Sequence, residues 1–308
     1  MARMDRREFV RRSLHVAAVS SAVGSVPLLD LLSFPARAAE SGGAKLAVRK
    51  GKDIPALIAE TFGALGGIET FVKRGETVVV KPNIGWDRTV EQGANTHPLV
   101  VRAVIEHCLE AGAKDVRVFD RTCNDPRRCY VQSGIQEAVE GMKSERVRIE
   151  HMDRRAYRDL DIVNGKDLTR WSFYQPALDA DRFINLPVAK HHGISTLTLG
   201  MKNIMGVIGG NRGRLHQNIA ESLADINSVV HSTLTLVDAT RILVANGPQG
   251  GRLEDVRVLD TLIASADIVA ADAYAATLFG HRPEDIPTIV AGARRGLGSL
   301  DLSPGRMA

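Results

Sequence analysis

The stretch PLVVRAVIEHCLEAGAKDVRVF, residues 98–119, predicts a helix followed directly by a strand. Pro98 suits the first turn of a helix, and Gly112 suits the position just beyond its end. Four apolar side chains recur between them at helical spacing and share one face, namely Val101, Val104, Ile105 and Cys108. The short apolar segment 116–119 then reads as a strand.

The same alternation continues on both sides of this stretch. The other predicted strands are 44–48, 77–80, 147–149, 182–186, 234–237 and 261–264. The other predicted helices are 54–65, 219–230 and 267–279, with a further helix containing 196–205. Such alternation predicts an α/β fold with a mostly parallel sheet flanked by helices on both faces. Residues 151–180, rich in Arg and Asp, break the rhythm and predict a surface excursion, with a hairpin as one form.

The first 38 residues have the composition of an export signal. Arg6 and Arg7 precede a mildly apolar run, and Ala36-Arg37-Ala38 resembles a cleavage site. Paired arginines indicate the twin-arginine (Tat) route; the alternative is an amphipathic helix with a chance Arg-Arg pair. We therefore expect the twin-arginine translocase as a partner, a periplasmic or other extracytoplasmic location, and a single α/β domain over 39–308. No later apolar run is long enough to span a bilayer.

Composition narrows the function classes further. The chain has 308 residues with a formal net charge of +4, and much of that surplus lies in the predicted signal, so nothing indicates nucleic-acid binding. The three cysteines form no C-x-x-C pair, so we expect no protein-ligated iron–sulfur cluster. Cys123 and Cys129 are close enough in sequence for a disulfide in an oxidising compartment, the alternative being two unpaired thiols in a loop.

Polar residues follow several predicted strands. Lys81 and Asn83 follow 77–80, Asp120 follows 116–119, Lys190 and His192 come after 182–186, and Asp238 follows 234–237. Ligands of open parallel sheets gather at the carboxyl ends of the strands. We therefore predict that these side chains share one crevice.

A second group of polar residues lies within the glycine-containing stretch that follows. Lys202 and Asn203 interrupt an apolar helix, and a glycine-rich turn with Arg212 leads to His216. Backbone N–H groups and guanidinium groups of such a turn can bind a phosphate or carboxylate, unless its arginines are simply solvated. The spacing matches neither the Walker A motif nor the dinucleotide fingerprint, and no hydrolase motif occurs.

The histidines allow two readings each. His97 opens the helix at Pro98, where an anion is favoured, and it could act as a ligand or donor or simply be a surface residue beside the cap. His191 and His192 point to opposite sides of an extended chain, so at most one can serve a metal. A solvated His-His loop is the other interpretation.

These motifs together resemble the domain-of-unknown-function family 362. The resemblance covers about residues 45–298 and rests on VVVKPN (78–83), THP (96–98), NLPVAKHH (185–192), LGMKNIMG (199–206), His216, VDA (237–239), ADA (271–273) and LFGHRPEDI (278–286). It implies an α/β architecture without a settled reaction. The shared residues are Lys81, Asn83, His97, Lys190, His192, Lys202, Asn203, His216, Asp238 and Asp272. Unlike many members, this chain lacks cluster cysteines, which argues against electron transfer, and it lacks the strand expected after Gly298.

We therefore expect an exported enzyme that binds a small anionic substrate or a metal-containing cofactor, and a divalent metal remains open. The expected catalytic residues are Lys202, His216 and Lys190. The expected substrate-binding residues are Lys81, Asn83, His97, Asn203 and Arg212, and the expected metal ligands are His192, Asp238 and Asp272. The alternatives are a non-catalytic periplasmic ligand-binding or redox-accessory protein, and a structural domain that has lost its activity.

Overall fold

The computed structural model describes residues 44–308, which belong to one compact unit. The predicted export signal lies outside the described residues. The strands are β1 Leu46–Lys50, β2 Thr77–Pro82, β3 Asp115–Val118, β4 Val147–Ile149, β5 Tyr157–Asp161, β6 Arg170–Tyr174, β7 Arg182–Leu186, β8 Val188–His192, β9 Thr196–Thr198, β10 Leu234–Leu243 and β11 Val256–Ser265. The helices are α2 Ile54–Ala64, α3 Pro98–Glu110, α4 Pro126–Gln132, α5 Ile135–Glu140, α6 Gln175–Leu178, α7 Gly200–Asn203, α8 Ile219–Asn227, α9 Ile268–Thr277 and α10 Pro287–Arg294. Three of the short 3₁₀ turns matter below: η4 Ile204–Val207, η5 Arg212–Asn218 and η8 Pro304–Arg306.

One mixed sheet organises the described part of the chain. Its strand order is β1-β11-β10-β7-β2-β3-β4, and β8 pairs with both β10 and β9. The pairs from β10 through β4 are parallel, whereas β11 runs antiparallel to both β1 and β10. The mostly parallel α/β fold predicted from the alternating pattern is therefore confirmed.

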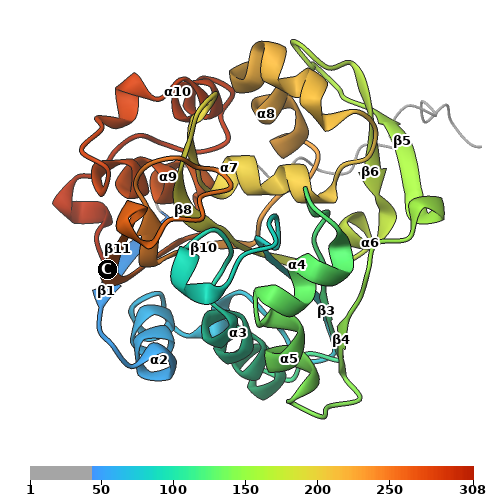
Figure 1. The fold of residues 1–308 in the computed structure, drawn as a ribbon, viewed down its shortest axis with the longest axis vertical. Coiled ribbons are helices and arrows are strands. Elements are labelled where there is room, and N and C mark those ends of the chain that lie inside the picture. Colours follow the sequence, from blue (N-terminus) through green and yellow to red (C-terminus); the bar gives the residue numbers. More distant parts are fainter. Residues whose placement is uncertain (1–43) are drawn as a thin grey trace, which may run out of the picture. The chain divides into compact units, whose positions relative to one another are not determined.

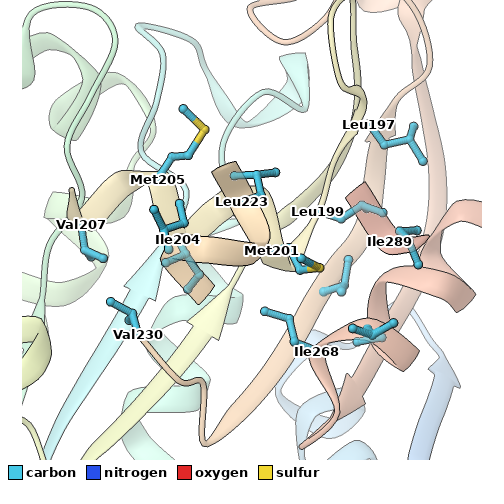
Figure 2. Packing of buried hydrophobic residues seen from close by; sticks show 14 of the residues in the cluster. Leu197, Leu199, Met201, Ile204, Met205, Val207, Leu223, Val230, Ile268 and Ile289 are labelled. Carbon is cyan, nitrogen blue, oxygen red and sulfur yellow. The ribbon is translucent and has the colours of Figure 1, made fainter. Parts of the chain in front are cut away.

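Helices cover both faces of this sheet (Figure 1). Because successive strand residues point to opposite faces, Val78 and Val80 pack with α2 and α3, whereas Val79 belongs to the cluster on the other side. That second cluster includes apolar residues of α7, α8, α9 and α10. Figure 2 shows its centre, where Met201 and Ile204 lie among Leu223, Ile268 and Ile289. The two cores bury the sheet on both faces, and the loops at its carboxyl edge start from these buried strands.

Residues 151–180 include the predicted hairpin, since β5 and β6 form a separate antiparallel pair. The prediction of a helix over 196–205 was wrong in its first half. Thr196–Thr198 pairs with β8 to form a hairpin, and the helix begins only at Gly200. Backbone pairing with an existing strand satisfies the donors and acceptors that a helix would otherwise use.

Differences also occur at the carboxyl end of the chain. Helix α10 was not predicted, and no strand follows it in the described chain; instead η8 leads to Met307, which bridges Leu46 of the edge strand β1. Within residues 44–308, no helix is both long enough and apolar enough to cross a membrane.

Candidate functional site

A cavity of about 610 Å³ opens at the carboxyl ends of β2, β3 and β8. Its walls come from the loops after β2 and β3, the β8–β9 hairpin, and the segment from α7 through η5. Seven of the residues that were assigned a role from the sequence line it: Asn83, Lys190, His192, Lys202, Asn203, Arg212 and His216. The structure thus brings together side chains from segments more than 100 residues apart.

Lys81 lies directly behind this cavity and is fully buried. Its Nζ is 2.8 Å from Oδ1 of Asp120, which does line the cavity. This contact is an ion pair of unfavourable hydrogen-bond angle, because Oδ1 has no hydrogen-bond partner among the described residues. Burial lowers the pKa of Lys81, and the Asp120 carboxylate opposes that shift. Lys81 therefore neutralises Asp120 rather than offering a free charge to a ligand.

A continuous polar network connects this ion pair to Lys190. Lys81 Nζ donates to Oδ1 of Asn203 at 3.1 Å, and Asn83 Nδ2 donates to the same oxygen at 2.9 Å. Lys190 Nζ in turn donates to Oδ1 of Asn83 at 3.0 Å and to the carbonyl oxygen of Ala94. The two predicted substrate-binding asparagines therefore have their amide groups largely committed to holding the lysines in place.

The two lysines on the cavity wall have no carboxylate partner among the described residues. Burial lowers the pKa of Lys190 to about 7, and it lowers the pKa of the half-buried Lys202 to about 8. Loss of hydration disfavours the charged form of an amine unless an anion compensates it. A bound anion would supply that compensation.

Two histidines stack on the wall beside Lys202. The rings of His192 and His216 have centroids 5.6 Å apart and planes 16° apart. Nδ1 of His192 accepts the N–H groups of Ile194 and Ser195, which leaves its proton on Nε2. Burial, with nearby Lys202, lowers the pKa of His192 to about 3, so this imidazole is neutral near pH 7.

His216 is oriented differently. Its Nδ1 lies 3.3 Å from the carbonyl oxygen of Gly213, so Nδ1 carries the proton and Nε2 can accept one. Lys202 Nζ lies 3.4 Å from that Nε2. Burial and Lys202 lower the pKa of His216. The pair can therefore exchange a proton.

Arg212 has a mostly structural role. Its guanidinium donates to the carbonyl oxygens of Arg121 and Thr122, each at 2.7 Å. These bonds attach the glycine-rich turn to the loop after β3. The positive charge still borders the cavity, so Arg212 contributes more to the field than to direct contacts.

Four predicted site residues lie outside the cavity lining: Lys81 directly behind it, and His97, Asp238 and Asp272. His97 caps α3, because its Nδ1 accepts the N–H of Leu99, and its own N–H donates to Oδ2 of Asp238 at 2.7 Å. The anion expected at this helix start is thus the Asp238 carboxylate. Burial lowers the pKa of His97. Asp272 is buried and accepts the N–H groups of Gly200 and Met201 at the start of α7.

The predicted metal ligands His192, Asp238 and Asp272 are therefore not assembled. In the described part of the chain, no three His, Cys, Asp or Glu side chains form a group that could hold a metal ion. Asp238 and Asp272 are each held by backbone N–H groups, which explains their burial without a cation.

Some lining residues had no role assigned from the sequence. Asp120 was predicted to share the crevice, and it does line the cavity, but it was given no role. The same strand-end pattern would have reached Trp86 after β2. Thr198 lines the cavity because β9 replaces the predicted helix. Cys123 is an exposed free thiol on the cavity wall, whereas Cys129 is free and buried in α4, so of the two open alternatives the structure has unpaired thiols. The sequence could not separate a disulfide from two free thiols, because that depends on the distance between the two sulfur atoms in the folded chain.

Fold and site together define an α/β protein with a cavity lined by amines, imidazoles and amides at the carboxyl edge of its sheet. The chain belongs to the family described as domain of unknown function (DUF362), whose model matches residues 78–277. A thylakoid-associated protein of Synechocystis sp. is 30% identical over 241 residues, covering 76% of this chain and 72% of that protein.

Two solved structures are similar at low identity. A structural-genomics crystal structure from Thermotoga maritima has a TM-score of 0.41 and 14% identity, covering 76% of this chain and 61% of the other. The lactate racemase apoprotein of Thermoanaerobacterium thermosaccharolyticum has a TM-score of 0.48 and 9% identity, covering 77% of this chain and 57% of the other.

Proposed function

We propose that this protein is an enzyme that binds a small anionic substrate in the cavity. One observation carries the proposal: the lysines on the wall lack carboxylate partners, while the single carboxylate among the described lining residues, Asp120, is neutralised by Lys81. Surplus positive charge on buried or half-buried side chains of the wall favours an anion, because Coulomb attraction is stronger there than in bulk water.

The roles follow from the contacts. Lys190, fixed by Asn83 and Ala94, binds the negative group of the substrate. Lys202 and His216 transfer a proton, since the imidazole is neutral and its Nε2 faces the amine. His192 lines the cavity with a neutral ring whose proton is on Nε2, which suits a donor to a substrate oxygen.

Isothermal titration calorimetry and thermal shift with phosphate, oxalate and pyruvate test binding, with urea as a neutral probe. We expect the anions to bind and urea not to bind. Lys190→Gln should weaken anion binding at least tenfold, whereas Lys52→Gln, at an exposed site, should change nothing. Equal response of both variants would refute the proposal. Binding without turnover of any tested substrate would instead support a ligand-binding protein.

We also propose export through the twin-arginine translocase to an extracytoplasmic location, supported by the order of Arg6-Arg7, the apolar run and Ala36-Arg37-Ala38. Replacing both arginines with lysine should leave the full-length chain inside the cell. N-terminal sequencing of the exported protein should begin near Ala39. Normal export of the double-lysine variant would argue for another route.

A further inference from the structure

The half-buried Lys202 differs from the buried Lys81 and Lys190 in its neighbours. Its Nζ lies 3.3 Å from Met205 Sδ and 3.4 Å from His216 Nε2, and the structure gives it no oxygen acceptor among the described residues. A thioether is a weak acceptor, and a neutral imidazole nitrogen can take a proton from the amine. This environment favours an unprotonated amine over an ammonium ion.

The amines of Lys81 and Lys190 have different neighbouring groups from that of Lys202. Lys81 is in direct contact with the Asp120 carboxylate, which favours its charged form. Lys190 donates to two oxygens, an amide and a carbonyl, neither of which can accept its proton. Lys202 alone among these three has a proton acceptor beside it and a place on the cavity wall. Loss of hydration or a neighbouring cation activates a lysine as a nucleophile, and at Lys202 both burial and Arg212 lower the pKa.

A second observation points to the group that the ligand carries. Thr198 is 4% exposed and lines the cavity, yet its Oγ1 has no hydrogen-bond partner among the described residues. A buried hydroxyl without a partner costs free energy. Thr198 is paired across the β8–β9 hairpin with Lys190, so the two side chains project from the same face. A hydroxyl donor beside an amine suits a carboxylate.

We propose that Lys202 forms a Schiff base with the carbonyl carbon of a small 2-oxo acid whose carboxylate is bound by Lys190 and Thr198. This inference rests on the anion-binding function proposed above and names the substrate class. The amine nitrogen attacks the carbonyl carbon, a C–N bond forms, and the oxygen takes a proton to give a carbinolamine. The C–O bond then breaks and water leaves.

The site itself can supply and accept every proton that this reaction transfers. His216 takes a proton from the attacking amine and returns one to the departing hydroxyl. Starting from the ammonium form, one cation and one carbonyl give one iminium ion and one water, so no oxidant, reductant or external proton is required. A lowered pKa of about 8 leaves part of Lys202 unprotonated at neutral pH.

Reductive trapping tests the proposal directly. The full chain is incubated with pyruvate and sodium cyanoborohydride, and intact mass and peptide mapping locate the adduct. We expect one adduct per chain, on Lys202, forming at least tenfold faster than on exposed lysines such as Lys52. Lys202→Met, which keeps the aliphatic stem, should lose that adduct while retaining the melting temperature within a few degrees. An adduct that persists in this variant, or that maps elsewhere, would overturn the assignment.

Two further measurements separate the two proposals. Thr198→Val, which keeps the shape, should slow trapping of pyruvate about fivefold or more and leave trapping of acetone, which lacks a carboxylate, unchanged. Oxalate binding by the unmodified protein without any pyruvate adduct would overturn the Schiff base and leave anion binding intact. Absence of both oxalate binding and an adduct would overturn both proposals.

Discussion

Lys81 Nζ and Asp120 Oδ1 lie 2.8 Å apart, with side chains 0% and 3% exposed, at the ends of the adjacent strands β2 and β3. The pair forms the floor of the cavity: Asp120 lines it, and Lys81 lies directly behind Asp120. Asp120 also accepts the N–H of Ile84, and Lys81 donates to Asn203. The proposed binding of an anion in the cavity depends on this pair, because Lys81 neutralises the one carboxylate of the described lining that could otherwise pair with Lys190 or Lys202.

Lys81→Met should destabilise the fold by about 3–5 kcal/mol, because it leaves the Asp120 carboxylate buried without a partner. Urea denaturation measures the change. Combining it with Asp120→Asn should recover part of the loss, since the uncompensated charge is then gone. Arg155→Met, which removes an exposed pair with Asp153, is the matched control and should change stability by less than about 1 kcal/mol. A loss for Lys81→Met as small as the control's would contradict this view of the floor.

Gly206→Ala should disturb the ion pair of Lys81 and Asp120, because Gly206 lies against both side chains. A Cβ at residue 206 would overlap Asp120 Oδ1 and Lys81 Nζ, so the turn at η4 must shift. We expect a loss of about 1–3 kcal/mol together with weaker oxalate binding. Gly63→Ala in α2 meets nothing within 4 Å and should instead stabilise by about 0.5–1 kcal/mol, since alanine is the better helix former. Equal effects of the two substitutions would show that close packing at Gly206 is unimportant.

Oxalate affinity should fall as the pH rises. Below the lowered pKa of about 7, Lys190 is already charged and binds an anion without taking up a proton. Above it, binding must be accompanied by protonation, so the dissociation constant should increase by up to about tenfold per pH unit. Titrations from pH 6 to pH 9 in buffers of different ionisation enthalpy measure both the affinity and the proton uptake. Lys190→Gln should show a flatter profile, and an identical slope in that variant would assign the effect to another group.

Asp272→Asn should weaken the start of α7, the helix that carries Lys202. An amide oxygen can replace only part of the acceptor capacity that serves the N–H groups of Gly200 and Met201. We expect a loss of about 1–3 kcal/mol and weaker oxalate binding. Asp53→Ala removes the cap of α2, away from the cavity, and should cost about 1 kcal/mol without affecting oxalate. Unchanged oxalate binding in Asp272→Asn would show that this carboxylate does not position the site.

The sequence placed most of the site because strand ends converge in a parallel sheet. Asn83, Lys190 and His192 were found in this way, and each lies on the cavity wall. The same pattern also selected Asp238, whose carboxylate instead binds the start of α3. Both environments put a polar residue after an apolar strand, so the pattern could not separate a ligand-facing carboxylate from one that caps a helix.

The sequence by itself determined the α/β class and its helix–strand order, because apolar periodicity reports which faces of each segment are buried. It also determined which basic residues follow the strands. Only the tertiary structure decided which polar side chains meet. Lys81 meets Asp120, and Lys202 meets His216, across 39 and 14 positions of the chain respectively, and pairing of this kind depends on distances of a few ångströms that local sequence does not encode. That distinction separates a floor whose charges cancel from a wall whose amines have no carboxylate partner among the described residues.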